Sequence, residues 1–150
     1  IIVVCSGVKS FLDVDKTAEA LETFGITTVG YKTDCFPLFY TSNSDIKLQH
    51  CYKSAKKVAG LFKLNKEARL SSSILVLNPV PKKHEIPYQE IDSIISSSIV
   101  EMENIGITGK DTTPHLLKTI AQKTENKSLE TNIRLALNNI SLGAKIAQKI

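Results

Sequence analysis

The 150-residue sequence contains no tryptophan, one methionine and three cysteines. The small number of cysteines limits the classes of protein to which the chain can belong. The cysteines Cys5, Cys35 and Cys51 are odd in number and form no CxxC pair, so a disulfide framework is not expected. Free cysteines favour a reducing compartment, and we therefore expect a cytoplasmic protein. No apolar run approaches the roughly 20 residues needed to span a bilayer, so we expect no membrane partner.

Several common catalytic motifs are also missing. The sequence has no G-x-G-x-x-G loop and no G-x-S-x-G elbow, which argues against a dinucleotide site and an α/β-hydrolase nucleophile. Its histidines, His50, His84 and His115, show no metal-ligand spacing, and His84-Glu85 lacks the second histidine of an HExxH site. We therefore assign no metal ligand within these residues.

The composition is that of one compact domain, with 42% apolar and 23% charged residues. Much of the net charge of +4 falls between Lys47 and Arg69. This basic stretch is either a solvated helix face or a field that attracts an anionic substrate. A nucleic-acid partner is not expected, because aromatic residues are not interleaved with the lysines.

The order of apolar segments predicts an α/β fold. Residues 1–5, 27–31 and 73–77 are short apolar runs typical of buried parallel strands. Helical patterns lie between and after these strands, although the second strand is followed first by an irregular stretch from Lys32 to Lys53, a loop long enough to be functional. The strand–helix–strand unit at the start implies a right-handed crossover. We therefore predict a three-layer α/β/α sandwich with a mostly parallel central sheet.

The helices have recognisable starts, ends and apolar faces. Apolar spacing predicts a first helix between Phe11 and Phe24, and Ser54 is a candidate N-cap for a second. A stripe of isoleucines predicts a helix over residues 88–104, and Pro114 indicates a further helix start. A last helix should open at Ser128 and turn a set of apolar side chains toward the core, namely Ile133, Ala136, Leu137 and Ile140.

Lys9 is the first candidate for chemistry, because it follows the first strand at the edge of the sheet where α/β proteins bind ligands. Proximity to a helix N-terminus and partial burial would both favour a neutral amine, the form that attacks a carbonyl to make a Schiff base. The alternatives are a surface lysine at a helix start, or a lysine that neutralises a phosphate.

A second candidate is the turn Gly106-Ile107-Thr108-Gly109-Lys110-Asp111-Thr112-Thr113-Pro114, whose backbone N–H groups could cradle an anion before a helix. It is not a Walker A loop, because Asn104 stands where that motif needs glycine. A helix C-cap followed by an N-cap explains the same residues. Asn132, in the first turn of the predicted last helix, could bind a sugar or phosphate oxygen, or serve only in capping.

These segments together resemble the pseudouridine-5'-phosphate glycosidases, a family that includes the indigoidine-synthase-A-like proteins. The resemblance lies in six segments that span nearly the whole chain: residues 3–13, 21–25, 29–37, 77–81, 106–114 and 128–133. By this resemblance, residues 1–150 are the C-terminal part of a single domain, whose sheet is incomplete at the N-terminus. The chain begins at Ile1 without a methionine and ends at Ile150 inside a helical pattern, as expected of a segment of a longer protein.

The resemblance implies a reaction that the residues alone could not name. Such enzymes reversibly cleave the C–C glycosidic bond of pseudouridine 5'-phosphate, giving uracil and ribose 5-phosphate. The lysine corresponding to Lys9 forms a Schiff base with C1 of the ring-opened ribose, and the iminium serves as an electron sink. Asn132 would contact the substrate. Lys110, Thr112 and Thr113 would help to shape the pocket, together with the loops at Thr33-Asp34 and Asn78-Pro79.

The resemblance also implies features outside these residues. The family's general-acid glutamate and metal-binding aspartate precede the segment, so a divalent metal, manganese, is expected with its ligand upstream of Ile1. Homotrimers and fusion to a sugar kinase are implied in the same way. One departure is Ser6-Gly7-Val8, which stands where the family usually has Ala-Gly-Ala. The chain alone is expected to be inactive. Two other functions stay open: a related sugar-phosphate enzyme, and an inactive sugar-phosphate-binding module.

Overall fold

The computed structural model describes all 150 residues and has a four-stranded parallel sheet at its centre. The strand order is β1-β4-β2-β3. The strands are β1 (Ile2–Cys5), β2 (Thr27–Tyr31), β3 (Cys51–Tyr52) and β4 (Ile74–Leu77). The three strands expected from apolar runs are confirmed. β3 was not predicted, because its two residues lie in an irregular stretch and are too few to show periodicity.

Five α-helices and two short 3₁₀ helices complete the fold. They are α1 (Val14–Thr23), α2 (Ala55–Glu67), α3 (Tyr88–Asn104), α4 (Thr112–Lys123) and α5 (Lys127–Ala147), with η1 (Lys82–His84) and η2 (Gly109–Asp111). None of them has the length and apolar character needed to cross a membrane. The predicted cap of α2 is confirmed, because the Ser54 hydroxyl accepts a hydrogen bond from the Lys57 N–H at 3.3 Å.

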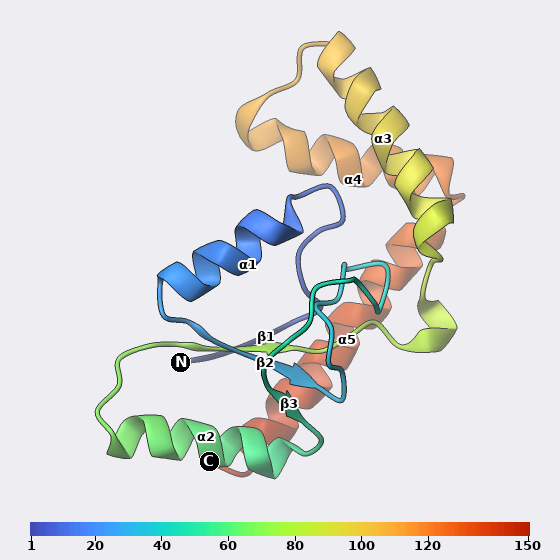
Figure 1. Ribbon diagram of the computed structural model, residues 1–150. Helices are drawn as coiled ribbons and strands as arrows, with labels where there is room; N and C mark the ends of the chain where they lie inside the picture. The colour runs from blue at the N-terminus through green and yellow to red at the C-terminus, as the bar shows by residue number, and fades with distance from the viewer.

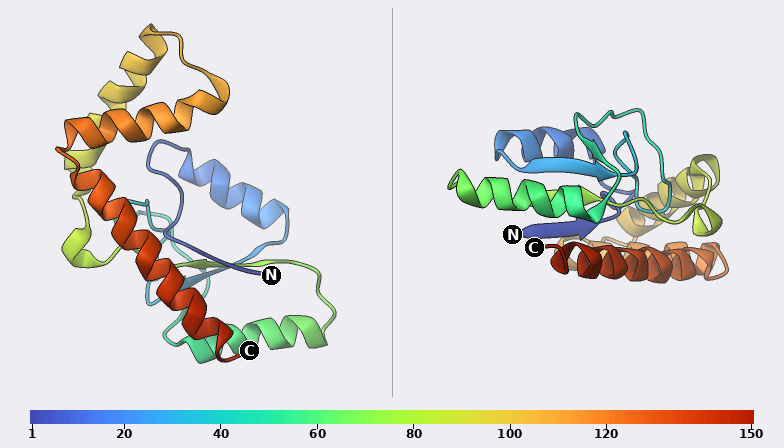
Figure 2. Two further views of the ribbon diagram at one scale, coloured as in Figure 1. Left: turned by 180° about the vertical axis from the view of Figure 1, so that it is seen from behind. Right: turned by 90° about the horizontal axis from the view of Figure 1, so that it is seen from below.

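The helices form layers on both faces of the sheet. The chain passes from β1 over β4 to β2 by way of α1, and returns from β3 to β4 by way of α2. Right-handed crossovers in opposite directions place α1 and α2 on opposite faces, as Figure 1 shows. The views in Figure 2 show α5 running past β1 toward α2. The three-layer α/β/α arrangement is therefore confirmed.

The buried side chains form two clusters. The first lies between the sheet, α2 and the C-terminal part of α5, and it consists of Val29, Val58, Ala59, Ile74, Val76, Leu142 and Ile146. The second holds the α3–α4 hairpin against the segments before it, and it consists of Tyr40, Ile86, Ile91, Ile95, Met102, Leu116 and Ile120. Phe11, from the loop after β1, packs against this second cluster. The loop that carries Lys9 therefore bridges the sheet and the hairpin.

The first helix begins later than its apolar spacing predicts. Asp13 is the N-cap of α1, and its carboxylate accepts a hydrogen bond from the Lys16 N–H at 3.0 Å. Phe11 and Leu12 therefore belong to the loop and not to the helix, so the prediction of a helix from Phe11 was wrong. An aspartate that caps the backbone fixes a helix start more strongly than apolar spacing does.

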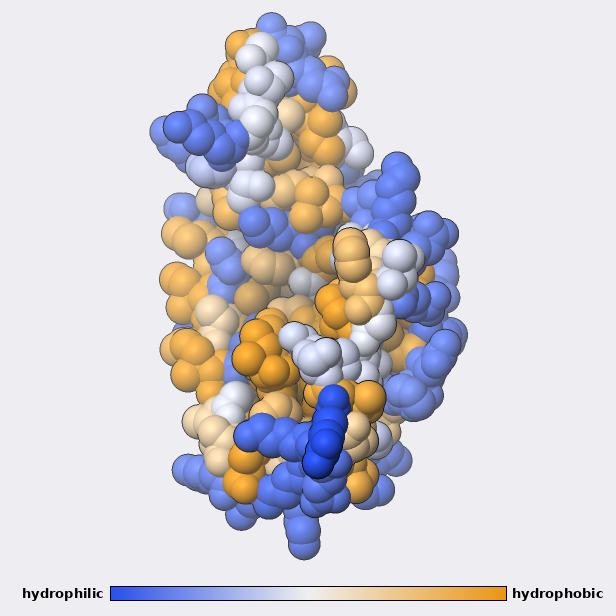
Figure 3. All heavy atoms as spheres, turned by 90° about the vertical axis from the view of Figure 1, so that its left-hand side faces the viewer, coloured by the Kyte–Doolittle hydropathy of each residue, from blue (hydrophilic) through white to orange (hydrophobic).

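The predicted inward face of α5 was also wrong. Ile133, Leu137 and Ile140 are 52%, 53% and 67% exposed, while Ser128 and Thr131 are buried at 1% and 2%. Hydrogen bonds explain the difference, because the Thr131 hydroxyl donates to the carbonyl oxygen of His84 at 2.8 Å. Buried hydroxyls with partners cost little, so contacts with η1 set the rotation of the helix. Hydrophobic atoms also lie open on the face drawn in Figure 3, below the α3–α4 hairpin at the top of that view.

Candidate functional site

The candidate site is built where β1 and β4 end side by side. Cys5 pairs with Leu77 in the parallel register, so the segments that follow the two strands leave the sheet together. The Asn78 N–H donates a hydrogen bond to the Cys5 carbonyl oxygen at 2.7 Å. The parallel hydrogen-bond pattern of β1 and β4 therefore extends one bond past the two strands, and Ser6 lies beside Asn78. The carboxyl edge of a parallel sheet is the usual ligand-binding edge of an α/β fold.

A side chain of α5 joins these two strand ends. The Asn139 amide oxygen accepts a hydrogen bond from Asn78 Nδ2 at 2.9 Å, and Asn139 Nδ2 donates to the Ser6 hydroxyl at 3.1 Å. Ser6 and Asn78 are only 2% and 5% exposed, and Asn139 is partly buried, so both contacts are partly shielded from water. We call these three residues the amide bridge. It ties the first residue after β1 to the first residue after β4.

The segment Pro37–Phe39 holds the opposite side of the same loop. The Phe39 N–H donates to the Ser6 carbonyl oxygen at 3.1 Å, and the Ser10 hydroxyl donates to the Leu38 carbonyl oxygen. Gly7 has a φ of +86°, and a Cβ at this position would collide with the carbonyl oxygen of Pro37. Only glycine fits so close to a neighbouring backbone. The loop is therefore held on both sides of the chain before it reaches Lys9.

Lys9 lies in this loop, between the amide bridge and α1, and its side chain is partly buried. Its ammonium nitrogen makes no hydrogen bond or ion pair with the protein, although its carbonyl oxygen accepts from the Leu12 N–H at 2.8 Å. α1 starts only at Val14. The expected proximity of Lys9 to a helix N-terminus is therefore wrong, because the effect of a helix dipole falls off within the first turn. The partial burial of Lys9 is as predicted.

The other predicted site residues lie on the helices that follow the sheet. Lys110 is in η2, Thr112 and Thr113 open α4, and Asn132 is in the second turn of α5, which starts one residue before the predicted Ser128. No side-chain hydrogen bond or ion pair links any of them to Lys9. Phe11 and Ile107 pack against the same buried cluster, which connects the Lys9 loop to the turn before Lys110. That the predicted residues form one site stays a prediction.

The structure adds residues that sequence reasoning did not assign. The Asn78-Pro79 turn was singled out, but Ser6 was treated only as a departure from the family pattern, and Asn139 was not mentioned as a site residue. One signal was present, since Asn138-Asn139 interrupts the apolar pattern of a helix with two adjacent amides. Amides within a helix often seek partners other than the helix itself, and here Asn139 finds them in two strand ends.

A metal site is not formed by these residues. No three histidine, cysteine, aspartate or glutamate side chains gather closely enough to hold an ion. The amide bridge offers only neutral oxygens, and a divalent metal such as manganese prefers carboxylates. The metal ligand that the resemblance implies precedes Ile1, so the manganese stays a prediction.

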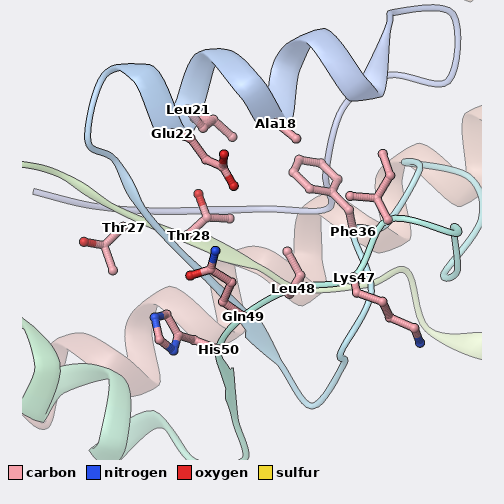
Figure 4. A pocket seen from close by; sticks show the side chains of 11 residues that line it. Ala18, Leu21, Glu22, Thr27, Thr28, Phe36, Lys47, Leu48, Gln49 and His50 are labelled. Carbon is pink, nitrogen blue, oxygen red and sulfur yellow. The ribbon is translucent and has the colours of Figure 1, made fainter.

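Two cavities flank the central sheet. One of about 230 Å³ lies between α1, β2 and the segment before β3, where Figure 4 shows Glu22, Thr28 and Gln49 around the opening. The other, of about 450 Å³, lies at the carboxyl ends of β2 and β4 and is lined by Lys32 and Lys82 among others. Asn78 lines this second cavity, so the amide bridge forms part of its wall.

Cys5 does not compete with Lys9 as a nucleophile. Burial raises the pKa of the Cys5 thiol above its ordinary value, and the backbone of Gly7 only partly offsets this effect. The thiolate is the reactive form of cysteine, so a raised pKa keeps Cys5 protonated and unreactive near neutral pH. Cys5 therefore does not replace Lys9 as the candidate nucleophile, and the catalytic role of Lys9 stays a prediction.

Comparison with known proteins finds matches that extend along almost the whole chain. Residues 1–149 match the family model described as indigoidine synthase A like protein. The pseudouridine-5'-phosphate glycosidase of Fervidobacterium nodosum is 44% identical over 150 residues, which are 100% of this chain and 51% of that protein. The chain therefore spans about half the length of the curated relatives it matches.

Two solved structures have the same fold. An indigoidine synthase A-like protein from Thermotoga maritima has a TM-score of 0.86 and 36% identity, over 97% of this chain and 48% of that one. The prealnumycin C-glycosynthase AlnA, solved in complex with ribulose 5-phosphate, has a TM-score of 0.87 and 23% identity, over 99% of this chain and 49% of that one. At that identity AlnA supports the fold alone.

Proposed function

Because this chain belongs to the indigoidine synthase A-like family, we propose that its protein reversibly cleaves pseudouridine 5'-phosphate to uracil and ribose 5-phosphate. The support is the match of residues 1–149 to the family together with relatives that carry this name. A bond between two carbons does not break by simple protonation of a leaving heteroatom, so the reaction needs a covalent catalyst.

We assign the covalent step to Lys9. The lysine nitrogen bonds to C1 of the ribose as the bond from C1 to the ring oxygen breaks, and that oxygen takes a proton. The nitrogen lone pair then forms the iminium as the C–C bond breaks, and the uracil carbon takes a proton. Water adds to the iminium and releases ribose 5-phosphate together with the free amine. In the reverse direction the iminium accepts the electrons of uracil.

The observation that carries this assignment is the setting of Lys9. Its nitrogen has no partner within the protein, and its loop is held by the amide bridge on one side and by Pro37–Phe39 on the other. A nucleophile on a fixed loop loses little freedom when it reaches a near-attack geometry. Asn132, Lys110, Thr112 and Thr113 are proposed to contact the substrate from the helices beyond.

The test is to trap the Schiff base in the protein expressed from its complete gene. We would incubate it with ribose 5-phosphate, reduce with borohydride and map any adduct by peptide mass spectrometry. The expected result is a pentose-phosphate adduct at Lys9 that is lost in Lys9→Arg and retained in Lys16→Arg, a lysine on exposed α1. No adduct from folded protein would favour the inactive binding module.

A second assay separates the proposed enzyme from a related one. Pseudouridine 5'-phosphate should release uracil in step with ribose 5-phosphate, which is followed by chromatography. Trapping of ribulose 5-phosphate at Lys9 without uracil release would indicate a different sugar-phosphate reaction on the same scaffold.

A further inference from the structure

We propose that Asn139 is the positioning residue for Lys9, acting through the amide bridge and not by touching substrate. The inference rests on the proposed Schiff-base function of Lys9 and extends it to a helix 133 residues away in sequence from Ser6. The side chain of Asn139 accepts a hydrogen bond from Asn78 and donates one to Ser6, so it fixes the distance between the two strand ends.

The position of Ser6 bears directly on Lys9, because only Gly7 and Val8 lie between them. Gly7 already lies against Pro37, so the loop cannot relax toward that side. On the other side the Asn139 amide is the side-chain partner of Ser6, and this contact joins a buried hydroxyl to a partly buried amide. If Ser6 shifts, the turn at Gly7 passes the shift on to Lys9.

The chemistry of the amide specifies which substitutions are informative. Asn139→Asp is not informative by itself, because its carboxylate keeps an acceptor for Asn78 and also for the Ser6 hydroxyl, whose oxygen lies 3.3 Å from Asn139 Oδ1. Asn139→Leu removes both hydrogen bonds. Ser6→Ala breaks the same contact from the other end by deleting one hydroxyl. The neighbouring Asn138 is the matched control, since its amide donates to the Pro79 carbonyl oxygen at 3.1 Å and does not reach Ser6.

The experiment measures, on the protein expressed from its complete gene, the rate of borohydride trapping at Lys9 and the Kd of ribose 5-phosphate. A small misplacement of a reacting group costs about 100-fold in rate. We therefore expect about 100-fold slower trapping in Asn139→Leu, with a Kd within about threefold of wild type, because the contacts to the sugar phosphate are intact. Ser6→Ala should slow trapping in the same way, and Asn138→Ala should not.

The outcomes separate this inference from the function on which it rests. Wild-type trapping rates in folded Asn139→Leu and Ser6→Ala would overturn the role of Asn139 and leave Lys9 catalysis intact. Equal losses in rate and binding, or equal slowing in Asn138→Ala, would show general damage to the fold and overturn it as well. No adduct in wild type would overturn the Schiff-base function itself. Non-additive effects in the Ser6→Ala, Asn139→Leu double variant would support the bridge as one unit.

Discussion

The two faces of α5 differ in a way that runs against simple amphipathic rules. The face turned inward carries hydroxyls and an amide, at Ser128, Thr131 and Asn139, beside the apolar side chains Leu135, Leu142 and Ile146. The face turned outward carries Ile133, Leu137 and Ile140, which are all more than half exposed. Hydrophobicity alone therefore does not favour one rotation of this helix over the other.

The difference teaches that specific partners outweigh apolar area at this helix. Thr131 donates to the His84 carbonyl oxygen, Ser128 accepts from the Thr124 hydroxyl at 2.9 Å, and Asn139 joins two strand ends. Each buried hydroxyl would cost about 1–3 kcal/mol without its partner, so the inner face is stable only in this register. Three substitutions compare the two faces, from the largest expected effect to the smallest, and a fourth at the cap of α1 serves as a reference far from this helix.

Truncation of the apolar part of the inner face should have the largest effect. Ile146 is 2% exposed within the cluster between the sheet and α2, so Ile146→Ala should lower the free energy of unfolding by about 3 kcal/mol. Urea denaturation followed by circular dichroism measures it. Ile133→Ala, on the outer face, is the control and should cost less than about 1 kcal/mol. Equal costs would mean that the two faces are not different.

Removal of one inner hydroxyl should have an intermediate effect. In Thr131→Val the shape is kept, but the bonds from Oγ1 to the carbonyl oxygens of His84 and Lys127 are lost, at a cost of about 1.5 kcal/mol. Thr23→Val is the matched control, because Thr23 makes the same kind of bond to Glu19 at an exposed position. The same denaturation assay applies, and a neutral Thr131→Val would show that the buried bond does not orient the helix.

Polar substitution of the outer face should change stability little. Ile140 is 67% exposed, so Ile140→Ser should stay within about 0.5 kcal/mol of wild type and should reduce any self-association seen by size-exclusion chromatography. A loss above about 2 kcal/mol would show that Ile140 is covered in the protein by contacts outside the described 150 residues.

Titration of the cap of α1 should have the smallest effect, far from α5. The Lys16 backbone N–H, more than its ammonium group, lowers the pKa of Asp13 below its ordinary value. A carboxylate with a lowered folded pKa stabilises the protein above its unfolded pKa, and the contribution is lost as pH falls through the folded pKa. Asp13→Asn keeps a neutral cap, so its stability relative to wild type should rise between pH 5 and pH 2. A constant difference across this range would contradict the prediction.

Sequence reasoning located most of the fold because its signals are local. Three strands, the Ser54 cap and the whole of α3 follow from short runs and spacing within single segments. The start of α1 and the rotation of α5 do not, because a carboxylate cap and distant hydroxyl partners decided them. Within the candidate site, Lys9 was identified from its place after β1 and from the family resemblance. The contacts that hold its loop were not identified from the sequence.

The sequence by itself determined the elements, their order and the lysine at the end of the first strand, because propensity and period act over a few residues. Only the tertiary structure decided that Ser6, Asn78 and Asn139 meet, since their sequence separations of 61 and 133 residues are closed by the parallel register of β1 with β4 and by the path of α5. A hydrogen bond between distant residues leaves no periodic trace in the chain, so it becomes visible only when the backbone has brought both partners together.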